Sequence, residues 1–112
     1  MSTMNYVKAA SVTSINSASI TGSLQVINTS GFPGPVFLLR IMNASNKDVA
    51  VSFDGSHAND YILANSTLEL NFQNNAQPNN YTCLLKQGTH VYVSGDAGTG
   101  YIYVAAYYQA NQ

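Results

Sequence analysis

The most telling shortage in this 112-residue sequence is charge. Four basic and five acidic residues make up 8% of the chain, against roughly 25% in a typical soluble domain. Nucleic-acid binding is disfavoured, because neutralising phosphates requires clustered Lys and Arg. The cations Lys8, Arg40, Lys47 and Lys86 are scattered instead. A surface with so little charge also lacks the repulsion that keeps copies apart. We expect a protein that works within an oligomer or lattice; a polar monomer coated with Asn, Ser and Thr is the alternative.

Cysteine and long apolar runs are equally scarce. Cys83 is the single cysteine, so no disulfide can form within the chain, and its apolar neighbours indicate a small buried residue. No apolar run approaches the roughly 20 residues that span a bilayer. The first residues lack the basic and apolar regions of a secretory signal. We expect a protein that is synthesised in a cytoplasm and is not inserted in a membrane.

Helical periodicity is missing too. Short β-branched and aromatic runs alternate with breaks of Gly, Asn, Asp and Pro, as they do in sandwiches and barrels. The 46% of apolar residues is enough for one core. We predict an all-β, single-domain β-sandwich, jelly-roll-like, of about eight short antiparallel strands. The predicted strands are 23–28, 36–43, 48–53, 61–64, 66–72, 81–86, 90–94 and 101–105.

The beginning of the chain differs in composition from the rest. Residues 11–23 are a mixture of Ser, Thr, Ala and Ile of low complexity. The segment 31–35 cannot pair regularly, because its prolines lack an amide donor and its glycines favour turns. We predict an N-terminal arm, or first strands, over residues 1–30 and the sandwich body over 31–112, within one domain.

Alternation in the predicted strands separates core from surface. It places Phe37, Leu39 and Ile41 on one face of their strand, and Val36, Leu38, Arg40 and Met42 on the other. The inward residues of the following strands are Val49, Val51, Phe53, Leu68, Leu70 and Phe72. Arg40 interrupts an otherwise apolar face, so it requires an acidic partner such as Glu69 or Asp48, or a place in an interface.

The last two predicted strands form a β-hairpin in this reading. They flank Gly95-Asp-Ala-Gly-Thr-Gly, whose glycines permit the positive φ angles of a turn. One register buries the valines and isoleucines of both strands. That register pairs Val93 with Ile102 and sets Tyr92 beside Tyr103 on the outer side.

Tyrosines supply the main candidate site. Tyr92, Tyr101, Tyr103 and Tyr107 share the outer face of the predicted hairpin. Cross-strand aromatic pairs stabilise a hairpin in their own right. A broad tyrosine surface is also typical of protein interfaces and of sugar-binding platforms. We interpret these four residues as a contact surface, with Arg40 as a further candidate.

No catalytic, metal or cofactor site is predicted. The glycine loop is followed by a strand, whereas a phosphate loop needs a helix N-terminus. His57 lies near Asp54 and Asp60, but three candidate ligands fall short of a structural zinc site, and Asp and Asn in loops usually cap the backbone. Neither His57 nor His90 has a nucleophile in a suitable context, and the carboxylates are isolated. We therefore expect a protein that is not an enzyme.

Three stretches resemble small virion proteins of tailed bacteriophages. They are Val36-Phe-Leu-Leu-Arg-Ile-Met-Asn-Ala-Ser-Asn-Lys-Asp-Val-Ala-Val-Ser-Phe-Asp-Gly, Leu63-Ala-Asn-Ser-Thr-Leu-Glu-Leu-Asn-Phe and Gly88-Thr-His-Val-Tyr-Val. The resemblance covers about residues 36–108 and implies a β-sandwich that decorates or cements a capsid, or sits at the head–tail junction or tail. It implies a homo-oligomer docked on capsid, portal or tail proteins of a virion, after synthesis in the bacterial host cytoplasm.

A carbohydrate-binding module is the alternative function. In that case the tyrosine platform would stack on sugar rings, and Asn, Gln and Asp would supply hydrogen bonds. The complete absence of Trp counts against it, because Trp is the largest stacking residue.

Overall fold

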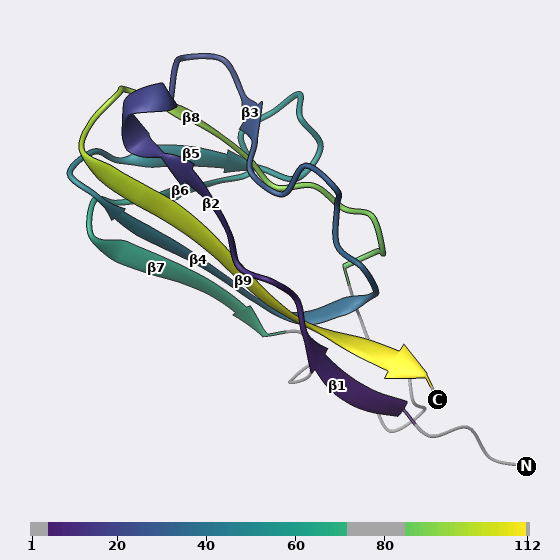
Figure 1. The fold of residues 1–112 in the computed structure, drawn as a ribbon. Helices are drawn as coiled ribbons and strands as arrows, with labels where there is room; N and C mark the ends of the chain where they lie inside the picture. Colours follow the sequence, from purple (N-terminus) through teal and green to yellow (C-terminus); the bar gives the residue numbers. More distant parts are fainter. Residues whose placement is uncertain (1–4, 72–84, 112) are drawn as a thin grey trace, which may run out of the picture.

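The computed structural model describes residues 5–71 and 85–111, and side chains within 7–71 and 85–108. These residues form two antiparallel sheets that face each other (Figure 1). The prediction of an all-β, single-domain sandwich is confirmed. No helix in the described part of the chain is long and apolar enough to cross a membrane.

Sheet A has five strands and carries most of the hydrogen bonding. β9 (Gly100–Asn111) and β4 (Val36–Ser45) lie at its centre, and β7 (Ser66–Asn71) is the edge beside β4. The other edge is shared, because β1 (Asn5–Ala9) and β2 (Thr13–Asn16) pair with successive parts of β9. Within the predicted arm or first strands over residues 1–30, residues 5–9 and 13–16 are therefore strands of this sheet.

Sheet B has four shorter strands in the order β3, β8, β5, β6. They are β3 (Gln25–Val26), β8 (Tyr92–Gly95), β5 (Val49–Ser52) and β6 (Asp60–Ile62). A short 3-10 helix, η1 (Ser17–Ser19), leads from sheet A towards sheet B. β3 and β6 are the two edges, so they lie on opposite sides of this layer.

The core fills the space between the sheets. Leu39 and Ile41 from β4, Val49 and Val51 from β5, and Ile102 from β9 are at most 1% exposed. Phe53, Leu68 and Leu70 pack against this cluster while remaining partly exposed. The predicted inward faces of these strands are confirmed. The predicted inward Phe72, the loop 74–80 and most of the strand 81–86 lie outside the described residues.

The predicted face of Val36 is wrong. The pairing of β4 with β9 shifts register between Val36 and Leu38, as it does at a β-bulge, where one extra residue reverses the alternation. Val36 is fully buried and belongs to the core cluster. From Leu38 onward the alternation follows the prediction, so Leu38, Arg40 and Met42 point away from the core.

The predicted hairpin of the last two strands is also wrong. β8 pairs with β3 and β5 in sheet B, whereas β9 pairs with β1, β2 and β4 in sheet A. Val93 and Ile102 are both buried, as predicted, but they belong to opposite walls of the core. The glycines do adopt positive φ, +154° at Gly95 and +109° at Gly100, in a link that crosses between the sheets.

Candidate functional site

The outer face of sheet A is the candidate site. Tyr101, Tyr103 and Tyr107 alternate with the buried residues of β9, so they point away from the core. The register sets Met42 opposite Tyr103 and Leu38 opposite Tyr107. We call this surface the tyrosine face. It consists of the three tyrosines, the two apolar side chains opposite them and the neighbouring ion pair of Arg40 with Glu69, that is, Leu38, Arg40, Met42, Glu69, Tyr101, Tyr103 and Tyr107.

The aromatic part of this face is partly preorganised. The rings of Tyr101 and Tyr103 stack at a centroid distance of 6.1 Å and an interplanar angle of 29°. Tyr101 is 44% exposed, and Tyr103 and Tyr107 are half-buried. Ser14 and Asn16 of β2 lie opposite Tyr103 and Tyr101 and supply a polar border. Rigid aromatic rings with polar tips suit a contact surface, because little side-chain freedom is lost on binding.

Arg40 is the cation of the tyrosine face. It lies directly opposite Glu69 of β7, and its Nε is 3.7 Å from the Oε1 of Glu69. Glu69 was one of the two partners predicted for it. Yet the Nε of Arg40 is buried without a hydrogen-bond partner, because 3.7 Å exceeds hydrogen-bond length. The Arg40 side chain as a whole is 38% exposed, so a docked surface can approach the guanidinium group although its Nε is buried.

Tyr92 does not belong to this site. It lies on β8 in the other sheet, so the prediction that it stands beside Tyr103 is wrong. Its ring packs over Gly55, where an added Cβ would lie 3.0 Å from the ring, and is 6.2 Å from the ring of His90. The tyrosine face instead gains Leu38 and Met42. Their role depends on the pairing of β4 with β9, which sequence alternation alone cannot reveal.

The loop that holds His57 is a backbone cap, as its composition indicated. The Oδ1 of Asp54 accepts hydrogen bonds from the amide of Ser56 at 2.8 Å, the amide of His57 at 3.0 Å and the hydroxyl of Ser52 at 2.9 Å. These donors, led by the Ser56 amide, hold the pKa of Asp54 below its ordinary value. Among the described residues, no group of three or more His, Cys, Asp or Glu side chains could hold a metal ion.

Fold and site together place the chain in the class of all-β sandwich proteins with an uncovered aromatic sheet face. Comparison with family models, with curated proteins and with solved structures found no match. The tyrosine face therefore has to be interpreted from its own chemistry.

Proposed function

We propose that the chain is a non-enzymatic structural protein of a tailed-phage virion, which self-assembles and docks on other virion proteins. Capsid decoration or cementing is favoured over a head–tail connector or a tail accessory role. The single observation that supports docking most is the tyrosine face. It joins three tyrosines, two apolar side chains and one imperfect ion pair on three neighbouring strands, β9, β4 and β7, of a five-stranded sheet.

The chemistry of this face favours another protein as the partner. Interface cores are enriched in Tyr, Met and Arg and depleted of most other charges. The face offers ring and aliphatic surface for apolar contacts, hydroxyl groups for hydrogen bonds and the partly exposed guanidinium group of Arg40 for an acceptor. A matching partner would present apolar side chains and backbone or carboxylate oxygens. The scarcity of charge across the chain leaves little to oppose close packing.

Electron microscopy of virions tests this proposal. Particles of the phage that encodes the chain should carry it at regularly repeated positions, and particles made without the gene should lack that density and bind the purified protein in its place. Light scattering of the concentrated protein should report an oligomer. Virions without the protein, together with a monomer in solution, would overturn the proposal.

Carbohydrate binding is kept as a second candidate because of one observation. The stacked rings of Tyr101 and Tyr103, with Ser14 and Asn16 alongside, form a small platform with polar groups at its border, as sugar rings require. A glycan array with the native chain and with Tyr101→Ser distinguishes the two functions. Specific glycan signals that Tyr101→Ser abolishes would favour sugar binding, and an array without signals would exclude it.

A further inference from the structure

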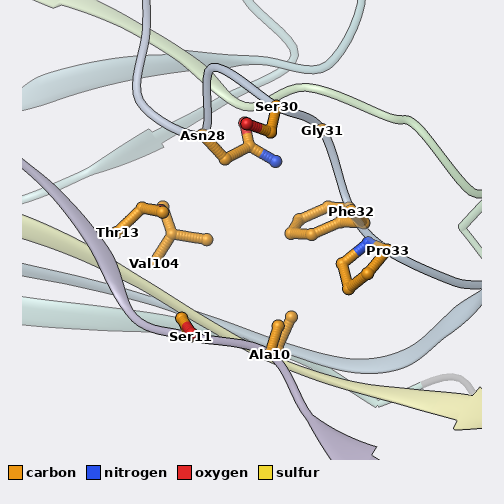
Figure 2. A pocket seen from close by; sticks show the side chains of 10 residues that line it. Ala10, Ser11, Thr13, Asn28, Ser30, Gly31, Phe32, Pro33 and Val104 are labelled. Atoms are coloured by element: carbon orange, nitrogen blue, oxygen red, sulfur yellow. The ribbon is translucent and has the colours of Figure 1, made fainter.

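A pocket opens between the two sheets, on the side of the molecule formed by β2 and β3 (Figure 2). Its volume is about 220 Å³. Phe32, Val104 and Ala106 form its buried walls and are at most 4% exposed. Ser11 and Ser30 lie at its exposed mouth. The tyrosine face does not include any of these residues, so the pocket is a separate feature.

The size and chemistry of the pocket limit what can occupy it. Drug-sized ligands need roughly 300–1,000 Å³, whereas an apolar cavity of about 150 Å³ binds benzene. The buried polar side chain in the pocket wall, that of Asn28, already has hydrogen-bond partners. Its Nδ2 donates to the carbonyl oxygen of Thr89 at 3.0 Å, and its Oδ1 accepts from the amide of Val91 at 2.6 Å. The pocket therefore suits one aromatic ring or branched aliphatic side chain.

Such side chains protrude from this same chain at β6. Tyr61 is 69% exposed and Leu63 is 63% exposed, more than any other large apolar side chain in the described part of the protein. Ile62 between them is buried, and the amide of Asn43 donates to the carbonyl oxygens of Ile62 at 3.1 Å and Leu63 at 3.2 Å. These contacts fix the backbone beneath the exposed side chains of Tyr61 and Leu63, which together we call the apolar knob.

The knob and the pocket lie on opposite sides of the sandwich. β6 and β3 are the two edges of sheet B, and β6 contacts β7, the edge of sheet A that is opposite β2. An interface between two different patches is heterologous, and repetition of it generates a ring or a filament. Either assembly is compatible with the low charge of the chain, because copies with few charges repel one another only weakly.

Charge around the two features is complementary. Lys86 lies in the turn that is bonded through Gly88 N to Phe32 in the pocket wall. Near the knob, Asp60 precedes Tyr61, and Asp48 accepts from Ala64 N at 2.8 Å. Lys47 offsets one of these carboxylates. The pocket side thus carries one lysine, and the knob side carries two carboxylates and one lysine.

We propose that the pocket receives the Tyr61–Leu63 knob of a second copy of this chain, in a head-to-tail contact that repeats from copy to copy. The proposal rests on the self-assembly proposed above and names its interface. Tyr61 or Leu63 of one copy fills the apolar space beside Phe32 of the next. Asp60 and Asp48 then approach Lys86 at the border.

Complementation between two variants tests this contact. Tyr61→Ser/Leu63→Ser removes the knob, and Ala10→Phe fills the pocket; Ser30→Phe, at the exposed mouth, is a second plug that leaves the core unchanged. Each variant alone should sediment as a monomer, with the circular dichroism spectrum of the native chain. A mixture of a knob variant and a plug variant should form a one-to-one dimer and nothing larger, because only one working contact remains.

Val7→Ser is the matched control, since it removes an exposed apolar side chain that belongs to neither the proposed contact nor the tyrosine face. It should keep the native oligomer. If the native chain assembles and the folded knob and plug variants assemble as it does, the contact is wrong, whereas self-assembly stands. If the native chain itself is monomeric at high concentration, the contact and self-assembly fail together, and docking through the tyrosine face is then judged separately by binding to virions.

Discussion

Asn43 shows how a single residue joins the two sheets. It lies on β4 and is 1% exposed, yet its amide is fully paired. Nδ2 donates to the carbonyl oxygens of Lys47 at 2.8 Å, Ile62 and Leu63, and Oδ1 accepts from the amide of Ser45 at 3.1 Å. A buried polar network that is satisfied in this way fixes one arrangement of the chain, because any other leaves several groups without partners.

Replacing Asn43 should therefore be costly. Asn43→Ala leaves buried carbonyl groups without donors, and we expect the free energy of unfolding to fall by about 1–3 kcal/mol. Urea denaturation monitored by circular dichroism measures it. Asn46→Ala is the control, because Asn46 is exposed and its side chain accepts one bond, from Thr99 N at 2.9 Å. If Asn43→Ala lowers the free energy of unfolding no more than Asn46→Ala does, this role of Asn43 is contradicted.

The lowered pKa of Asp54 predicts that the free energy of unfolding depends on pH. Its pKa is lower in the folded chain than the ordinary value, so its ionised form stabilises the fold. This contribution is complete above about pH 4 and is lost as the pH falls below that value. The native chain should exceed Asp54→Asn in free energy of unfolding at about pH 7, and by less at about pH 3. If the two proteins differ in free energy of unfolding by the same amount at both pH values, the hydrogen bonds from the Ser56 and His57 amides do not depend on the charge of Asp54.

At the scale of elements, local pattern and topology differ in what the sequence reveals. The inward faces of β4, β5 and β9 follow from alternation, because burial of one face fixes every second residue. Alternation does not reveal which strands β8 and β9 pair with. Both strands carry the same alternation whether they form a hairpin or face each other across the core, and the glycine-rich link suits either path. Tyr92 was therefore assigned to the wrong surface, while Tyr101, Tyr103 and Tyr107 share a face as predicted.

The crossing link makes its own prediction. Gly100 has φ +109°, and a Cβ there would clash with the carbonyl oxygen of Ala44 on β4. We expect Gly100→Ala to lower the free energy of unfolding by more than about 1 kcal/mol. Gly22→Ala is the matched control, because nothing lies within 4 Å of the added Cβ. Comparable thermal melting of the two variants would argue against the close approach of β9 to the end of β4.

At the scale of the whole molecule, three surfaces have separate proposed roles: one in docking and two in self-assembly. The tyrosine face lies on the outside of sheet A, and the pocket opens between β2 and the segment 28–33 that follows β3. The Tyr61–Leu63 knob lies at the opposite edge. Lateral contacts between copies leave the face of the sheet free. An assembly built through knob and pocket would therefore present several tyrosine faces together, and docking would gain from multivalency.

The central claim is that the tyrosine face docks on a virion surface. Co-sedimentation with particles that lack the protein measures it most directly, with the double variant Tyr101→Ser/Tyr103→Ser compared against Tyr92→Ser, which changes a tyrosine of the other sheet. We predict that the folded double variant binds at least about tenfold more weakly than the native chain, since a central aromatic contact contributes more than about 1.4 kcal/mol. Tyr92→Ser should bind as the native chain does. Undiminished binding of the double variant would contradict the account.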